Sequence, residues 1–503
     1  MADEAQTQTI RSVNWREVFP FTHLFRAFRI AVHPSKLLLA LAALLLIYLG
    51  GRVLDGVWPE RYRADQTEVR QYMVASDRYS AADADAAMKE FLRAAGRRDV
   101  EAFDTAPADA AGRKGVFITF FESEIGQVNR IIRSAIALNW YTTFDGVWHF
   151  LARGPSLLFR NHPLFGVLFT AWFLVIWSVF GGAVARIAAV HVARDEKISV
   201  RQALRFSISK VLSFLFAPLI PLLIILVIGC VVSATGWLLM TLKVPFIMGL
   251  IFFLALLAGF IMTLVALGTI GGFNLMFPTV AVEGSDSFDA ISRSFSYVFA
   301  RPWRMLWYTL VALVYGGIAY LFVKFFLFVM LAMTHFFVGW WLGPTASQYW
   351  NGSPSIWPAP SFDNLTYTID YAHLKPMDDV AAGLISFWVY LVIGLLGAFA
   401  ISFYFSANTI IYYLMRREVD ATELDDVYVE ESEDEFGEPL PVAAGTGPVV
   451  AATAGAGPTT SSTGAGQVQE GPAGGARAYG GPEGETRPAD PNAGTPPGGA
   501  PTE

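Results

Sequence analysis

The chain has 503 residues, of which 54% are hydrophobic, 14% aromatic and 16% charged, and its formal net charge is −7. Soluble globular proteins carry about 25% charged residues, so this composition excludes an ordinary soluble domain and, with its long apolar runs, indicates a membrane protein. The single cysteine, Cys230, excludes a disulfide within the chain and a cysteine metal cluster.

Residues 1–36 predict a cytoplasmic N-terminus that contains one amphipathic helix, apolar on one face and basic on the other. The apolar face comprises Phe21, Leu24, Phe25, Phe28 and Val32, and the basic face comprises Arg26, Arg29, His33 and Lys36. Because a membrane span follows at once, we predict that this helix lies on the inner leaflet, with Arg26 and Arg29 as interfacial anchors toward anionic headgroups. The alternative is an ordinary cytoplasmic helix packed on the protein.

Six segments are apolar and long enough to cross a hydrocarbon core of about 30 Å, which needs ~20 helical residues. They are roughly Leu37–Leu54, Pro163–Ala185, Val211–Ala234, Pro245–Phe277, Met305–Met333 and Val380–Leu414. The last three exceed a single crossing, which favours tilt or projection beyond the bilayer. The N-terminal residues are polar and no convincing cleavage site follows, so we expect the anchor at 37–56 to be a retained signal anchor.

Lysine and arginine placement predicts the orientation of these spans. Basic residues gather before the first span, between the second and third, between the fourth and fifth, and after the sixth. The positive-inside bias therefore places both termini in the cytoplasm. Residues 57–162 then form an extracytoplasmic helical segment, with a polar helix-prone stretch near 80–104 and an amphipathic helix over Val116–Asn139.

Two segments of the chain are similar in sequence, Glu196–Val211 and Glu283–Val298. Helix caps coincide in the two copies, because Ser199 and Gln202 form a capping-box pattern and Asp286 stands at the corresponding cap position. This self-similarity predicts a parallel two-fold repeat, with units at 163–234 and 245–333. The alternative is that capped amphipathic helices at one interface look alike for physical reasons alone.

The second copy carries a family resemblance. Its residues resemble an integral membrane domain found beside bacterial glycerophosphoryl diester phosphodiesterases, over roughly residues 163–415. The matching residues are Pro278, Val280, Val282, Glu283, Ala290, Ser294, Arg301, Trp303 and Arg304. Phosphodiesterase activity in that family belongs to a separate soluble barrel domain that this sequence lacks, so the resemblance implies a membrane architecture and no catalytic residue. From the residues themselves, Arg301, Trp303 and Arg304 are predicted to anchor a turn at the headgroups.

Polar residues inside the spans offer two candidate transport residues. Lys324 lies roughly 28 Å along the fifth span at 1.5 Å per residue, which places it near the outer interface, where a lysine can snorkel. Asn274 is more simply explained by a bond to a neighbouring helix than by a substrate. The seven histidines show no metal-ligand spacing, and the sequence has no phosphate loop, nucleophile elbow or dinucleotide fingerprint.

After Arg417 the composition changes. Residues 416–438 form an acidic cytoplasmic segment, and Asp420–Glu438 alone holds 10 acidic residues without a lysine or arginine. Residues 439–503 are rich in Gly, Pro and Ala and predict a disordered tail. The acidic segment suggests either a cytoplasmic partner or a solubilising stalk.

The sequence therefore predicts an all-α membrane protein of about six transmembrane helices, with a five-helix transmembrane domain at 163–415 and interfacial amphipathic helices. We expect no enzyme activity, no cofactor, no metal and no nucleic-acid binding. The favoured function is a structural or accessory component of the bacterial inner membrane. Its expected partners are membrane lipids and either other membrane proteins or a second copy of the chain. The alternative is a transporter or lipid-handling protein with a cavity between the two repeat units.

Overall fold

The computed structural model describes residues 19–64, 115–243, 245–350, 356–367, 369 and 376–428. These residues belong to the compact unit Met1–Glu430, and the second unit is Glu431–Glu503. The predicted helix near 80–104, residues 429–438 of the acidic segment, and the predicted tail at 439–503 lie outside the described residues.

The described part of the chain is helical, and six of its helical segments are long and apolar enough to cross a membrane. The predicted all-α, multi-pass architecture is thus confirmed. These segments are α3 (Pro34–Val57), α9 (Pro163–Ile176) continued through the π-helical turn η5 (Trp177–Gly181) into α10 (Gly182–Arg194), α12 (Val211–Thr241), α13 (Pro245–Glu283), α15 (Pro302–Trp350) and α16 (Pro376–Asp420).

The last three helices are continuous and longer than the apolar runs from which they were predicted. Helices α13, α15 and α16 have 39, 49 and 45 residues. At 1.5 Å per residue they are roughly 58, 74 and 68 Å long, well beyond a hydrocarbon core of about 30 Å. Their polar ends therefore extend past the apolar runs, and the charged groups described below lie on those ends.

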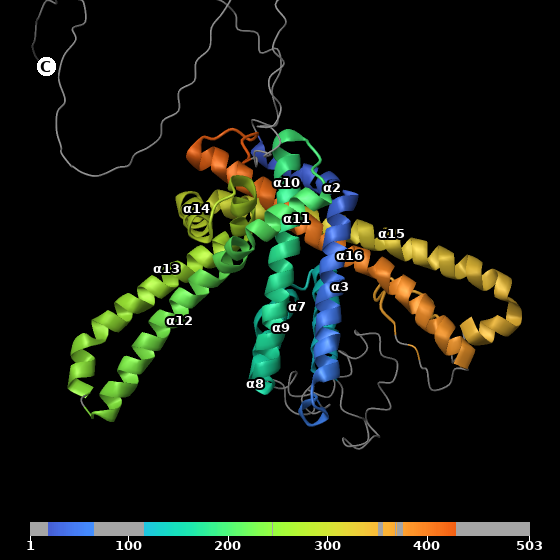
Figure 1. Cartoon of the computed structure of the whole chain (residues 1–503), viewed down its shortest axis with the longest axis horizontal. Coiled ribbons are helices and arrows are strands. Elements are labelled where there is room, and N and C mark those ends of the chain that lie inside the picture. The colour runs from blue at the N-terminus through green and yellow to red at the C-terminus, as the bar shows by residue number, and fades with distance from the viewer. Residues whose placement is uncertain are drawn as a thin grey trace, which may run out of the picture. The chain divides into compact units, whose positions relative to one another are not determined.

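Helices α12 and α13 pack side by side as one hairpin, and α15 and α16 pack as another (Figure 1). Helix α3 packs along α16, where Leu41 occupies the space that a side chain at Gly394 would need. Gly272 in turn lets α13 approach Ser294 of the next helix. Gly394 and Gly272 therefore let helices of this same chain approach each other closely.

Two short helices connect the spans in the predicted repeat units. Helix α11 (Val200–Ser209) has the expected capping box, because Ser199 and Gln202 satisfy each other's backbone N–H groups. Helix α14 (Ser287–Ala300) is capped by Asp286, whose side chain accepts a bond of 2.9 Å from the Asp289 N–H. The two predicted caps are confirmed, and the repeat itself stays a prediction.

The N-terminal helix consists of η1 (Pro20–Phe25) and α2 (Arg26–Ala31), and it packs on α10, α15 and α16. The face that it buries differs from the predicted apolar face. Leu24, Ala27, Ile30 and Ala31 are fully buried, whereas Phe25 and Val32 are 50% and 41% exposed. Small residues at helical spacing allow close contact with α16, where Ser402 Oγ donates to the Ala31 carbonyl at 2.7 Å.

The segment predicted to lie outside the membrane contains α6 (Val116–Ile136), α7 (Trp140–Trp148), the π-helical turn η4 (His149–Arg153) and α8 (Gly154–Asn161). Asp55 at the end of α3 caps α6 from a distance in sequence, because its carboxylate accepts from the Phe117 and Ile118 N–H groups at 2.8 and 3.1 Å. A carboxylate at a helix N-terminus is favoured by the helix dipole. This contact fixes α6 to the first span.

Candidate functional site at the end of α13

Helix α13 ends at Glu283, and Gly284 turns the chain toward α14. Gly284 has φ +63°, and its N–H bonds the Val280 carbonyl at 2.9 Å, as at a left-handed helix end. A Cβ on Gly284 would lie 2.7 Å from the ring of Tyr428. Glycine is required here both for the backbone conformation and for the close approach of that ring.

The Glu283 carboxylate is held from two other helices. Arg293 of α14 places Nε 2.9 Å from Oε2, and Arg416 of α16 places Nε 3.3 Å from Oε1. The Tyr412 hydroxyl, also from α16, donates to the same carboxylate. The side chains of Glu283 and Arg416 are only 10% and 12% exposed, so this ion pair is screened little by solvent.

Both arginines have a second carboxylate. Arg293 pairs with Asp289 one turn earlier in α14, at 3.1 Å. Arg416 pairs with Asp426 at 2.7 Å and also donates to the Asp426 carbonyl at 2.9 Å. We call Glu283, Asp289, Arg293, Tyr412, Arg416 and Asp426 the Glu283 network. Its two guanidinium groups lie among three carboxylates, and each of these carboxylates has a basic partner.

Two further carboxylates at the end of α16 accept bonds from tyrosines. The Tyr297 hydroxyl of α14 donates to Asp420, and the Tyr308 hydroxyl of α15 donates to Glu418. Arg304 also reaches Glu418, at 2.6 Å. Burial and then the hydrogen bond to Asp420 raise the pKa of Tyr297, which keeps its hydroxyl protonated as a donor. The end of α16 is therefore bonded to α13, α14 and α15 together.

The residues after α16 return to this site. The Tyr428 N–H donates to the Val282 carbonyl at 2.8 Å, and Arg186 of α10 donates to the carbonyls of Tyr428 and Ala281 at 2.6 and 2.7 Å. The Arg186 guanidinium also lies 4.3 Å from the ring centroid of Phe206, within cation–π range. Arg186 thus joins α10 to the returning segment and to α13.

Among the residues predicted as anchors, Arg304 takes part in these contacts, whereas Arg301 and Trp303 are exposed, Trp303 at 81%. The candidate transport residues have other neighbours. Lys324 donates to the Asp363 carbonyl at 3.3 Å and lies 5.0 Å from the ring centroid of Phe362. Asn274 accepts a bond of 2.8 Å from the Tyr404 hydroxyl of α16.

Sequence reasoning missed most of the Glu283 network, because its members are far apart in the chain. Tyr412 follows Glu283 by 129 residues, and in the contact beside the network Tyr428 follows Arg186 by 242 residues. The available signal was the run "YYLMRREVD" at the end of the last apolar segment, in which tyrosine, arginine and acid follow one another. It indicated a span end and did not specify a partner.

The described residues hold no group of three His, Cys, Asp or Glu side chains placed to bind a metal. Both oxygens of the Glu283 carboxylate are taken up by donors of the protein, which come from α14 and α16. Comparison of the chain with protein-family models, with curated proteins and with solved structures finds no match. The resemblance noted for residues 163–415 therefore stays a prediction.

Proposed function

We propose that this membrane protein is a non-catalytic structural or accessory component of a bacterial inner membrane. The observation that carries the proposal is the Glu283 carboxylate, which is held at once by Arg293, Arg416 and Tyr412. A carboxylate that acts in catalysis has to reach a substrate proton or atom. One that is saturated by basic groups and a tyrosine is suited to holding helices in a fixed arrangement.

The orientation with both termini in the cytoplasm is part of this proposal. It rests on the basic residues around Asp195, on α11 and after α16, which all lie on one side of the predicted spans. Reporter fusions after α16 and within the segment 115–162 would test it. We expect a cytoplasmic signal from the first and an extracytoplasmic signal from the second, and the reverse result would contradict the orientation.

The accessory role is tested by quantitative proteomics of membranes from a strain that lacks the gene. We expect a defined set of membrane proteins to fall in abundance and to recover when the wild-type protein is restored. Glu283→Ala should insert in the membrane without restoring that set, because the helix ends are no longer held together. Arg301→Gln, a change at an exposed residue of the adjacent turn, is the matched control and should restore it.

A transport role is the second candidate, and one observation favours it: Lys324 lies in a span and is only 5% exposed. Ionisable residues inside membrane spans are often functional. Flux into proteoliposomes that is lost in both Lys324→Ala and Asn274→Ala would support transport and contradict the accessory role. A panel of ionic and lipid substrates that shows no flux above protein-free vesicles would favour the accessory role.

A further inference from the structure

Basic side chains from two helices gather around the carboxylate of Asp195, which follows α10 in a left-handed conformation with φ +56°. Arg26 and Arg29 of α2 each place Nη2 3.7 Å from Asp195 Oδ1, and His191 Nε2 lies 3.5 Å from the same oxygen. These separations are too long for good hydrogen bonds. The Asp195 side chain is 64% exposed, so its contacts with these basic groups are weakened by solvent.

A lysine lies fully buried in the same region. Lys36 at the start of α3 has no exposed surface, and its Nζ donates to Ser406 Oγ of α16 at 3.1 Å. Ser406 is neutral and already donates to the Ser402 carbonyl. No ion pair between Lys36 and a carboxylate is found in the described ranges. A buried lysine that donates to a neutral hydroxyl keeps donor capacity for a further acceptor.

Two imidazoles beside this lysine have unused ring nitrogens. The rings of His33 and His191 meet edge to face with centroids 6.0 Å apart, and Nδ1 of each is buried without a hydrogen-bond partner. His191 is 6% exposed. Burial, then Lys36 and Lys197, lower the pKa of His33, because desolvation and nearby basic groups both disfavour the charged ring.

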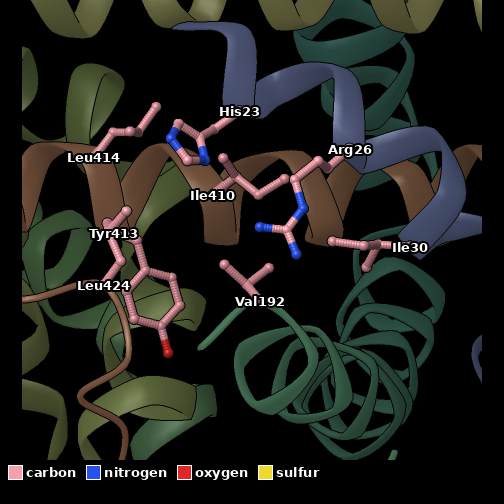
Figure 2. A pocket seen from close by; sticks show the side chains of 8 residues that line it. All are labelled: His23, Arg26, Ile30, Val192, Ile410, Tyr413, Leu414 and Leu424. Carbon is pink, nitrogen blue, oxygen red and sulfur yellow. The ribbon is translucent and has the colours of Figure 1, made fainter. Parts of the chain in front are cut away.

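The charges of this cluster do not balance. Arg26 and Arg29 both face the carboxylate of Asp195, and Lys36 and Lys197 are further basic groups near His33. Figure 2 shows the Arg26 guanidinium extending from α2 toward Val192 of α10, at the edge of a small cavity of about 40 Å³. The remaining lining is mostly apolar, so the cavity supplies little to neutralise the surplus.

We propose that the basic cluster of Arg26, Arg29, His33, Lys36 and His191 binds a phosphate group, with Asp195 as the carboxylate that the phosphate replaces. Guanidinium forks match phosphate oxygens, and the imidazole nitrogens add single donors, while the buried Lys36 lies behind them. The nine-tenths buried ring of His191 shares Asp195 Oδ1 with the two arginines, and its Nδ1 has no hydrogen-bond partner, so this imidazole can offer the ligand a polar contact.

The expected source of this phosphate is an anionic phospholipid. The apolar residues Phe25, Val32 and Leu38 are close in sequence to the basic residues of the cluster, and they are 50%, 41% and 61% exposed. Such neighbours suit acyl chains beside a headgroup at the predicted inner leaflet. A free phosphate ion would use the same basic groups and would gain nothing from these apolar residues. The site is separate from the Glu283 network and does not depend on the proposed accessory role.

Lipid binding by the full-length protein in nanodiscs tests the proposal. The nanodiscs contain equal amounts of phosphatidylcholine and phosphatidylglycerol, and native mass spectrometry counts the lipids that stay bound. We expect the wild-type protein to retain phosphatidylglycerol preferentially. Arg26→Gln with Arg29→Gln should weaken this retention about tenfold, as the loss of one or two charge-assisted contacts would. Asp195→Asn should strengthen retention, because the competing carboxylate is gone.

Arg205→Gln is the control, because Arg205 is an exposed arginine of α11 outside the cluster. It should leave retention unchanged, and equal weakening by this control would show diffuse attraction and overturn the site. Unchanged retention in the Asp195 and arginine variants would overturn it as well. If the arginine variant fails to fold, the Asp195→Asn variant still tests the site. This change lies at an exposed residue, and the proposal expects it to bind phosphatidylglycerol more tightly than the wild type. Calorimetric titration with inorganic phosphate tests the other source. If the variants change phosphate binding in the same pattern and the wild type shows no preference for phosphatidylglycerol, the phosphate site is supported and the lipid is rejected as its source.

Discussion

Replacing Glu283 with glutamine would test whether its charge holds α13, α14 and α16 together. The substitution keeps the size of the side chain and an acceptor for the Tyr412 hydroxyl, and it removes the charge that faces Arg293 and Arg416. Removing one partner of a buried ion pair costs ~3–5 kcal/mol when the other charge is left uncompensated. Here the cost is smaller, because each arginine keeps a second carboxylate.

The magnitude follows from the exposure of those two arginines. Arg416 is 12% exposed and loses one of two carboxylate partners, whereas Arg293 is 40% exposed and remains in contact with water. Losing the charged acceptor of one buried hydrogen-bonded pair costs about 1.5–3 kcal/mol, and the half-exposed pair adds ~0–1 kcal/mol. We therefore expect Glu283→Gln to lower the free energy of unfolding by about 2–3 kcal/mol.

Equilibrium unfolding in bicelles measures this change. Asp289→Asn is the matched control, because the ion pair between Asp289 and Arg293 is partly exposed to solvent. This substitution should lower the free energy of unfolding by about 1 kcal/mol or less. A double-mutant cycle between Glu283→Gln and Arg416→Met should give a coupling free energy of roughly 1–2 kcal/mol. If Glu283→Gln costs no more than Asp289→Asn, or the coupling is zero, the assignment of Glu283 as the central charge is refuted.

Three further predictions concern other parts of the fold. Glu124 of α6 is 8% exposed, and burial raises its pKa from 4.5 to about 8. Between these values the unfolded chain loses the proton and the folded chain keeps it, so stability should fall by roughly 4 kcal/mol as pH rises from 4.5 to 8 and then level off. Gly284→Ala should cost about 1–2 kcal/mol through its positive φ, and hydrogen exchange should show that Tyr428 and its neighbours are less protected. Cys230, exposed on α12, should react with a membrane-permeable maleimide and resist a charged one.

Each of these has its own control. Glu124→Gln should remove the fall in stability between pH 4.5 and 8, and a fall that persists in this variant would assign it to other groups. Gly249→Ala, at a position with nothing within 4 Å of the added methyl group, should leave protection at Tyr428 unchanged. Cys230→Ser should abolish the maleimide signal, and equal labelling of Cys230 by both reagents would place it outside the hydrocarbon core.

The elements that the sequence predicts well are those fixed by local chemistry. Six apolar runs of sufficient length gave six candidate spans, because a helix must satisfy its own backbone groups in a hydrocarbon core. The caps at Ser199 and Asp286 were equally local, since an N-cap side chain bonds an N–H group only two or three residues ahead. The helix ends were less certain, because α13, α15 and α16 continue through polar residues that hydropathy does not count.

Tertiary structure decided what those elements meet. The N-terminal helix could bury either of two overlapping faces against the rest of the protein. It buries the face with Ala27 and Ala31, because these small residues let α16 approach closely. By itself, the sequence determined that Glu283 ends a span and that Arg416 follows another. Their ion pair, the carboxylate of Asp55 that caps α6, and the gathering of Arg26 and Arg29 on Asp195 all join distant segments. Hydrophobic periodicity shows that a helix has a buried face, but the partner of that face depends on how all the helices pack.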